Sequence, residues 1–501
     1  MSIKSLAGQT VWYGVSSIAA RFVNYLLTPI LTYSIVVSKA DFGRMGAVYS
    51  IMPLMNVLFT YGMETTYFRF VQNKETKALV NGTASVSLLI TTIVFSVLLW
   101  FNQSFLIEVT TLQGFPLLIQ LSLVIITLDA FSTIPFARIR NEGRPKLFAL
   151  IKVAGIFISV GLTAFFIMYC PYLYKKTGGN SWIVMVYRPD VNPIVYVLIA
   201  NIVQSAFTLL LLARWFIPSD LRFSFAVWKQ MMIYTLPMLV AGLGGMVNET
   251  FDRLMLGWWL PHAHSYADDQ RGIYNACYKL SILITLFIQA FRMGAEPFFF
   301  KQAEGKSAPL VYARVMKFFV LTITLMFLVV SLYIPVWKFF ISPPYWEGLK
   351  VVPILLLANM SLGIYYNLSI WYKITNRTLA GGAITLIGVV ITVVINWLFI
   401  PKYSYMACAW ATFLCYFTMM VVSYVWGQKH YRVPYAWKKL LAYLIIVVLL
   451  FFVHKAFTML WANTVYSLAV ATVLILSYLW FISRVERKEF KQLPVIGKYI
   501  K

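Results

Sequence analysis

Two apolar stretches decide the fold of this chain: MMIYTLPMLVAGLGGMVNETFDRLM at residues 231–255 and ACYKLSILITLFIQAFRMGAEPFFF at residues 276–300. As a helix, each stretch is long enough to cross a hydrocarbon core of about 30 Å. Charged side chains inside such a stretch cost free energy in lipid, so they face a protein interior or a water-filled path. The polar and charged residues embedded in the two stretches are Asn248, Glu249, Asp252, Arg253, Lys279, Arg292 and Glu296.

The second stretch has a relative near the N-terminus. Ala47-Val48-Tyr49 aligns with Ala276-Cys277-Tyr278 at an offset of 229 residues, and Gly43 aligns with Gly272 at the same offset. Internal repeats that enclose a central site are typical of membrane transporters. We therefore predict a transporter built from two similar lobes.

The composition places the chain among multi-pass membrane proteins. Of its 501 residues, 60% are hydrophobic and only 12% are charged, whereas about a quarter of an average soluble protein is charged. Apolar runs of about 20 residues, each long enough to span a bilayer, recur from end to end. We predict an all-α membrane protein with fourteen transmembrane helices, at residues 10–36, 45–67, 79–101, 115–137, 147–170, 193–216, 230–252, 273–299, 312–340, 350–373, 380–400, 405–427, 440–459 and 464–483.

Basic residues gather on one side of the predicted membrane. The net charge is +25, and most lysines and arginines fall in the loops on the side of both termini. Because cytoplasmic loops carry an excess of Lys and Arg, both termini are predicted to be cytoplasmic. The loops are too short to form a basic soluble domain, so the charge does not indicate nucleic-acid binding.

The linkers between spans divide the chain into three parts. Residues 1–228 are predicted to form an N-lobe of spans 1–6, and residues 229–428 a C-lobe of spans 7–12. Residues 429–501 add spans 13 and 14 and a basic cytoplasmic tail. Such a tail is expected to lie along the anionic inner membrane surface.

Several short motifs resemble those of one known family. Asp41-Phe42-Gly43 and Gly62-Met63-Glu64 flank span 2, and Asp252-Arg253-Leu254-Met255-Leu256-Gly257 follows span 7. Gly272-Ile273-Tyr274-Asn275-Ala276 opens span 8, and Gly363-Ile364-Tyr365-Tyr366-Asn367 lies in span 10. Together they resemble the polysaccharide flippases of the MATE-like superfamily of multidrug, oligosaccharidyl-lipid and polysaccharide exporters.

The resemblance implies two six-helix lobes that face each other across a cavity and work by alternating access. It also implies the substrate, a polyprenyl-pyrophosphate-linked oligosaccharide moved from the cytoplasmic to the periplasmic leaflet of a bacterial inner membrane. The product would serve surface polysaccharide biosynthesis, such as the O-antigen of lipopolysaccharide. Expected partners are membrane lipid and other polysaccharide assembly proteins, and the chain is expected to act as a monomer and not as an enzyme.

Two arginines deep in the predicted spans are candidates for binding the pyrophosphate. Arg21 lies about 16 Å into span 1, near the bilayer centre, and a guanidinium suits bidentate phosphate binding. The alternative for Arg21 is a structural ion pair with Asp129 or Glu64. Arg292 is either a second cavity cation or the partner of Glu296, one helical turn away. The candidate substrate-binding residues are Arg21, Asn24, Arg292, Lys279, Gln289, Tyr365 and Tyr366.

Acidic residues in the spans are candidates for ion coupling or for a gate. Asp129 is a lone acid among Ile and Leu and is a hypothetical proton site. Glu249 and Arg253 are four residues apart on one helix, which predicts a gate pair at the outer end of span 7. The coupling ion, H⁺ or Na⁺, stays open; the four cysteines lack metal-ligand spacing, and no metal or other cofactor is expected. The coupling and gate candidates are Asp129, Glu64, Glu249, Asp252, Arg253 and Glu296.

Two other functions compete with the flippase. A multidrug or organic-cation antiporter of the same superfamily needs an acidic cavity, whereas the deep charges here are mainly basic: Arg21, Lys279 and Arg292 against Asp129. A membrane enzyme such as a polysaccharide polymerase would carry a large periplasmic loop with acids and arginines. No loop of this chain has that length.

Overall fold

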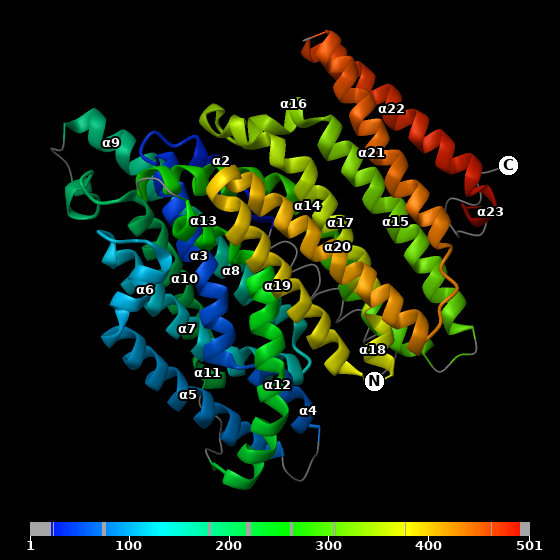
Figure 1. Ribbon diagram of the computed structural model, residues 1–501. Helices are drawn as coiled ribbons and strands as arrows, with labels where there is room; N and C mark the ends of the chain where they lie inside the picture. Colours follow the sequence, from blue (N-terminus) through cyan, green and yellow to red (C-terminus); the bar gives the residue numbers. More distant parts are fainter. Residues whose placement is uncertain are drawn as a thin grey trace.

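A computed structural model describes residues 22–490, apart from residues 24, 73–76, 179–181, 217–221, 261–263, 304, 306, 376 and 462. All regular secondary structure in this part of the chain is helical (Figure 1). The prediction of an all-α fold is therefore confirmed, and the membrane-length helices described next confirm that the protein is polytopic.

Within the described residues, twelve helical segments are long and apolar enough to cross a membrane. They agree with the predicted spans 3 to 14. They are α5 (Lys77–Phe101), α7 (Pro116–Asn141), α8 to α9 (Pro145–Thr177), α10 (Pro193–Leu211), α12 (Phe225–Thr250), α14 (His264–Gln302), α15 (Ala308–Leu332), η4 to α18 (Pro343–Ile374), α19 (Thr378–Tyr403), α20 (Tyr405–His430), α21 (Trp437–Leu460) and α22 (Thr464–Val485).

The first two predicted spans differ from the others. Much of residues 10–36 lies outside the described residues, and only α2 (Leu27–Thr32) represents that span. The second span corresponds to α3 (Lys39–Thr60) and α4 (Met63–Phe70). The helix breaks between them because Tyr61 and Gly62 both have positive φ, 37° and 77°, a conformation that ends a right-handed helix.

Shorter helices connect the long ones. Helix α12 ends at Thr250, which corrects the predicted end of span 7: Asp252 and Arg253 begin a separate helix, α13 (Asp252–Trp259). The other short elements of the described residues are α6 (Gln103–Thr110), α9 (Cys170–Thr177), α11 (Ala213–Phe216), α16 (Ile334–Trp337), α18 (Ile370–Ile374), α23 (Arg487–Phe490), the π-helical turn η1 (Phe165–Tyr169) between α8 and α9, and the 3₁₀ turns η2 (Trp182–Met185), η3 (Lys338–Phe340) and η4 (Pro343–Val351).

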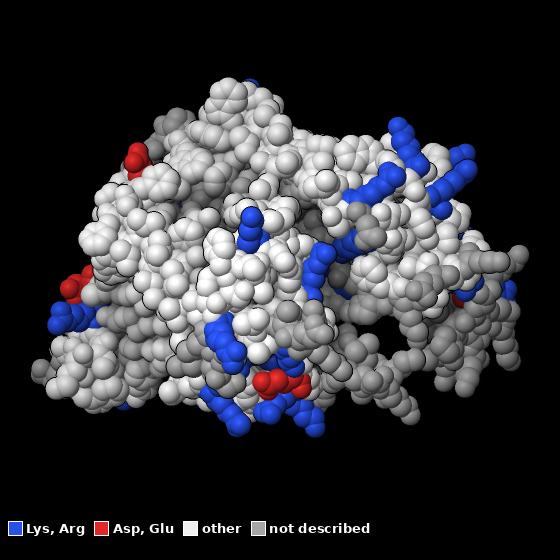
Figure 2. Space-filling view, turned by 90° about the horizontal axis from the view of Figure 1, so that it is seen from below, with Lys and Arg blue, Asp and Glu red and all other residues white. Residues whose placement is uncertain are grey.

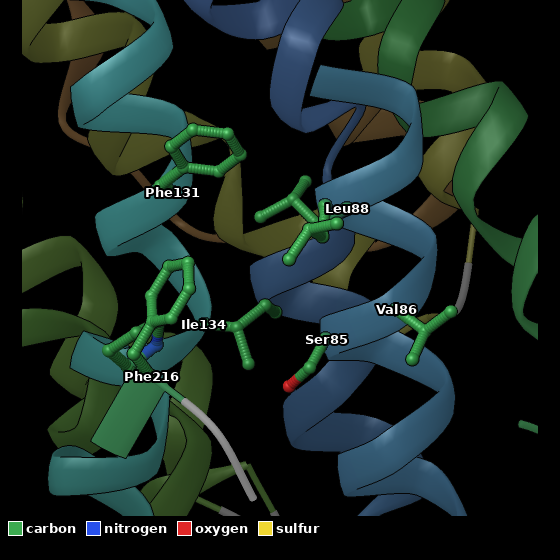
Figure 3. Close-up of a pocket in the computed structure, with 8 residues that line it drawn as sticks. Ser85, Val86, Leu88, Phe131, Ile134 and Phe216 are labelled. Atoms are coloured by element: carbon green, nitrogen blue, oxygen red, sulfur yellow. The ribbon is translucent and has the colours of Figure 1, made fainter. Parts of the chain in front are cut away.

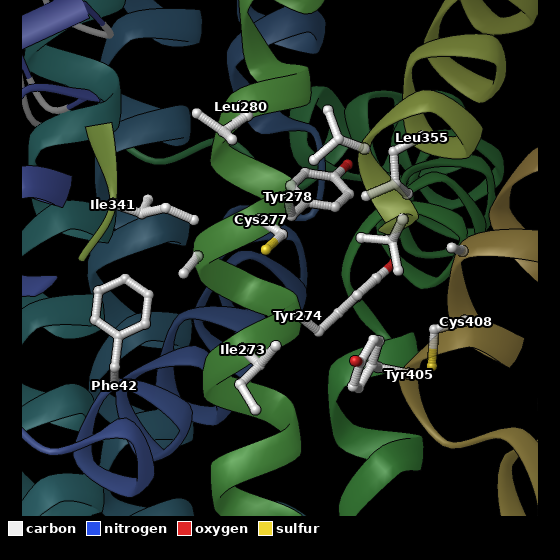
Figure 4. Close-up of a cluster of buried hydrophobic side chains, with 14 of the residues drawn as sticks. Phe42, Ile273, Tyr274, Cys277, Tyr278, Leu280, Ile341, Leu355, Tyr405 and Cys408 are labelled. Atoms are coloured by element: carbon white, nitrogen blue, oxygen red, sulfur yellow. The ribbon is translucent and has the colours of Figure 1, made fainter. Parts of the chain in front are cut away.

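Helix α14 lies at the centre of the bundle. It packs along α3 on one side and along α17 (Val352–Leu368) on the other, while α12 packs against both α3 and α19. Figure 4 shows buried side chains on several faces of α14, with Phe42 of α3 to one side of the helix. Phe42, Ile273 and Cys277 have no exposed surface. The earlier helices therefore meet the later ones chiefly along α12 and α14 (Figure 1).

Helices α21 and α22 form an outlying pair that packs on α15 (Figure 1). Glu486, just after α22, is 2% exposed and anchors this pair. Its carboxylate accepts hydrogen bonds from Lys439 Nζ at 2.6 Å, Tyr443 OH at 2.5 Å and Lys317 Nζ at 3.3 Å. Burial alone would raise the pKa of Glu486, but the contacts with Lys439, Tyr443 and Lys317 hold it below its ordinary value.

Replacing Glu486 by Gln is expected to lower the stability of the folded protein. Removing one partner of a buried ion pair costs several kcal/mol, and the low end, about 3 kcal/mol, applies because Lys439 is partly exposed. Since folding lowers the pKa of Glu486, its stabilisation is present above the unfolded pKa of about 4.3 and is lost as the pH falls through the folded value. Thermal unfolding in detergent at pH 7 and pH 4 should show a difference between variant and native protein at pH 7 that shrinks at pH 4.

Candidate functional site

A polar cavity lies where α14 faces the earlier helices. Its volume is about 410 Å³. Asp129 of α7 and Ser205 of α10 line one wall, and Asn275 and Lys279 of α14 line the opposite one. The remaining lining residues come from α2, α3, α7 and α10: Leu27, Thr28, Leu31, Phe42, Met45, Tyr49, Met52, Ile125, Val197, Asn201 and Gln204.

A second cavity, of about 140 Å³, continues past the first one. The two share Tyr49, Asn275 and Lys279. The second is closed on its far side by α12 and α13, which contribute Glu249 and Arg253. Residues from both predicted lobes therefore line a continuous polar region.

Lys279 stands at the junction of these two cavities. It forms no ion pair with any residue that the structure describes. Asn275 lies one helical turn before it on the same face of α14, so an amide and an ammonium point into the same space. An ammonium without a carboxylate partner inside a membrane protein is free to bind an anion.

The wall opposite Lys279 is fixed by hydrogen bonds. Asp129 Oδ1 accepts from Ser205 Oγ at 2.7 Å. Ser159 Oγ donates to Asn201 Oδ1 at 2.7 Å, and the amide of Asn201 donates in turn to the hydroxyl of Tyr49. Asp129 was predicted from the sequence, whereas these amides and hydroxyls were not, although polar residues in apolar spans were the available signal.

Asp252 and Arg253 form a buried ion pair at the second cavity. Arg253 Nη1 lies 3.1 Å from Asp252 Oδ1 and donates to the backbone carbonyl of Glu249 at 2.9 Å. Tyr274 OH donates to Asp252 Oδ2 at 2.6 Å, and the guanidinium of Arg253 lies 4.2 Å from the ring centroid of Tyr278. The carboxylate that pairs with Arg253 is therefore that of Asp252 and not, as was predicted, that of Glu249. Glu249 lines the second cavity.

Arg292 lies at a second level of α14. It lies thirteen residues after Lys279 on α14, a rise of about 20 Å along the helix. Its guanidinium lies 4.5 Å from the ring centroid of Tyr366, and both line a narrow pocket with Gly363 and Asn367. The two cations therefore sit at different depths of the same helix.

The other predicted site residues do not gather at this cavity. Glu64 pairs with Arg140 where both side chains are about 40% exposed. Tyr365 is buried in a separate core cluster and its hydroxyl lies 3.3 Å from that of Tyr372. Tyr365 therefore cannot stack on a substrate in this conformation.

Three predicted site residues fall outside what the structure describes. They are Arg21 and Asn24, together with the side chain of Glu296. Gln289 lies on α14 between Lys279 and Arg292, three residues before Arg292, and it has contacts of its own. The described residues contain no group of three or more His, Cys, Asp or Glu side chains that could hold a metal ion.

A different pocket, of about 310 Å³, lies between α5, α7 and α11. Figure 3 shows Leu88, Phe131, Ile134 and Phe216 around it, with the hydroxyl of Ser85 as a polar group. None of the described residues that line it is charged. Its chemistry suits apolar groups, so it is a poor candidate for a charged headgroup.

The face of the molecule seen in Figure 2 carries many Lys and Arg side chains and few Asp and Glu. It is the face at which α4 and α18 lie in Figure 1. The loops at this end are those predicted from the sequence to be cytoplasmic. The opposite end, with α9 and α16, is the predicted periplasmic side.

Comparisons with known proteins agree with this architecture. Residues 6–302 match the family described as "Polysaccharide biosynthesis protein". No curated protein matches the chain. Among solved structures, the chain is similar to "Lipid II flippase MurJ, inward closed conformation", with a TM-score of 0.72 and 15% identity over 95% of this chain and 99% of that one.

Two MATE structures are also similar. One is the "Inward-facing conformation of a multidrug resistance MATE family transporter of the MOP superfamily", with a TM-score of 0.61 and 12% identity over 82% of this chain and 94% of that one. The other, "Crystal structure of MATE in the straight conformation", has a TM-score of 0.58 and 12% identity over 85% of this chain and 95% of that one. At these identities the likeness shows the shared fold.

Proposed function

Because the chain belongs to the polysaccharide biosynthesis protein family, we propose that it flips a polyprenyl-pyrophosphate-linked oligosaccharide across a bacterial inner membrane. Transport runs from the cytoplasmic to the periplasmic leaflet by alternating access and supplies surface polysaccharide biosynthesis, including O-antigen. The chain works as a multi-pass monomer with cytoplasmic termini, alongside other polysaccharide assembly proteins. Its role is transport and not catalysis.

The observation that carries this proposal is Lys279 in the shared wall of two polar cavities. Moving an ionised headgroup into a low-dielectric medium without compensation costs tens of kcal/mol. A cation in a wet cavity removes much of that cost. The lack of a carboxylate partner among the described residues leaves the ammonium of Lys279 available to the pyrophosphate.

Other residues are candidates for contacting the sugar and for a second contact with the pyrophosphate. Arg292, stacked on Tyr366, offers a cation and an aromatic surface at a deeper level of the path. Arg21 and Asn24 are proposed to complete the cationic path from the first span. The hydroxyl and amide groups of Tyr49 and Asn201 offer hydrogen bonds to sugar hydroxyls.

Asp129 is the proposed site of ion coupling. Its carboxylate shares the cavity with Lys279 and receives one hydrogen bond, from Ser205. Binding of H⁺ or Na⁺ at Asp129 would change the cavity charge next to the substrate. The headgroup and the coupling ion would then compete or cooperate through electrostatics.

One observation favours a second function, the organic-cation antiporter. Asp129 and Glu249 each line one of the two cavities, and carboxylates suit cationic drugs. Lys279 opposes that function because it stands between them and would repel a cation.

Purified protein in proteoliposomes distinguishes the two functions. We expect it to move a polyprenyl-pyrophosphate-linked oligosaccharide, loaded in the inner leaflet, to the outer leaflet, where an impermeant glycosidase releases the sugar. Protein-free liposomes give the background. Extrusion of an organic-cation dye driven by an H⁺ or Na⁺ gradient, without sugar release, would establish the antiporter instead.

A further inference from the structure

Helices α3 and α14 touch backbone to backbone at two glycines. A Cβ atom added to Gly43 would lie 1.8 Å from the carbonyl oxygen of Asp268, and one added to Gly272 would lie 2.1 Å from that of Lys39. Side-chain atoms do not approach a backbone this closely, so any larger residue would push the two helices apart. Only glycine permits this crossing.

The contact is reciprocal along the sequence repeat. Gly43 and Gly272 are 229 residues apart, and so are Lys39 and Asp268, the residues whose carbonyls they face. Each glycine therefore faces the residue that lies one helical turn before the other glycine. A two-fold axis between α3 and α14 would produce this pattern, with each half of the chain contributing one helix.

Buried charges bind the two helices at the same level. Arg44 Nε of α3 lies 3.0 Å from Asp268 Oδ2 of α14, while Arg271 Nη1 lies 2.9 Å from Asp268 Oδ1. Arg44 Nη1 also pairs with Asp41 Oδ1 at 2.8 Å. Arg271 is fully buried and Asp268 is 5% exposed, so water and salt screen these interactions weakly.

The crossing closes one end of the polar cavities. Gly46 and Asn275, about one turn beyond Gly43 and Gly272, already line the 140 Å³ cavity. Lys279 follows one further turn along α14. A substrate at Lys279 therefore cannot leave toward the beginning of α14 unless α3 and α14 separate.

We propose that the Gly43–Gly272 crossing and the Arg44–Asp268 ion pair form the outer seal of the transport path. The glycines let the two halves close without a gap, and the ion pair holds them closed until transport requires opening. This inference rests on the proposed alternating-access function. It moves the outer gate from the Glu249–Arg253 pair to α3 and α14.

The test of the seal measures how fast the thiol of an Asn275→Cys variant is labelled in right-side-out membrane vesicles. With native glycines, an impermeant maleimide added outside should react slowly. Gly272→Ala wedges the helices apart and should raise the reaction rate about tenfold, through a larger outward-open population. Arg44→Gln removes the ion pair without adding side-chain volume at the crossing, and it should raise the reaction rate by a smaller factor.

Gly161→Ala is the matched control. Gly161 lies in α8, where an added Cβ meets nothing within 4 Å, so the labelling rate should stay at the native value. Unchanged labelling in both Gly272→Ala and Arg44→Gln would overturn the seal, even if sugar release in proteoliposomes is normal. Faster labelling of the two variants, together with no sugar release by the native protein, would keep the seal and overturn the flippase.

Discussion

Replacing Lys279 by Met is expected to reduce oligosaccharide flipping about a hundredfold. Removing one partner of a buried charge pair costs roughly 2–5 kcal/mol, and each 1.4 kcal/mol is a factor of ten. Methionine fills a similar volume but leaves the pyrophosphate without its cation between the two cavities. Lys279→Arg keeps the positive charge and should retain substantial transport.

The measurement is sugar release in proteoliposomes at matched protein content. Lys455→Met is the control, because Lys455 also lies in a membrane-crossing helix but in α21, away from the cavity linings. Its flipping rate should equal that of the native protein. Native activity in Lys279→Met would remove this residue from the substrate path.

Replacing Asp252 by Leu is expected to destabilise the folded protein strongly. Asp252 is 3% exposed and holds both Arg253 and the hydroxyl of Tyr274. Its loss leaves the buried guanidinium without a carboxylate partner and costs about 3–5 kcal/mol, against a total stability of about 5–15 kcal/mol for a typical protein. Much less protein should reach the membrane, and what does should unfold at a lower temperature.

The double variant Asp252→Leu, Arg253→Met separates charge from packing. Replacing both members of a buried pair by apolar residues is often neutral or stabilising, so the second substitution should restore most of the membrane level by immunoblot. If the single variant accumulates and unfolds as the native protein does, the pair has no structural role.

The membrane-crossing helices could be predicted because hydropathy reports burial in lipid directly. Spans 3 to 14 match the structure, yet α14 begins at His264 rather than near residue 273. The added turns carry Asp268 and Arg271, which no hydropathy pattern assigns to a helix. They are helical because α3 and α13 pack against them and the ion pairs compensate their charges.

The site was predictable only in part, for a similar reason. A charged residue in a membrane span, such as Lys279 or Asp129, is a candidate functional residue because its burial in lipid costs free energy. Both residues line the main cavity. Which carboxylate meets which cation depends on packing between distant segments. Arg44 and Asp268 are 224 residues apart, and Asp252 rather than Glu249 pairs with Arg253 because α12 ends at Thr250.

The pair α21 and α22 has a consequence for how such a chain evolves. A helical hairpin added after α20 crosses the bilayer twice, so it returns the C-terminus to the side from which it departed. One in-frame insertion or truncation near residues 431–436, the stretch between α20 and α21, would add or delete the hairpin without inverting any preceding helix. Lineages can therefore gain or lose this element while the orientation of every earlier span is inherited unchanged.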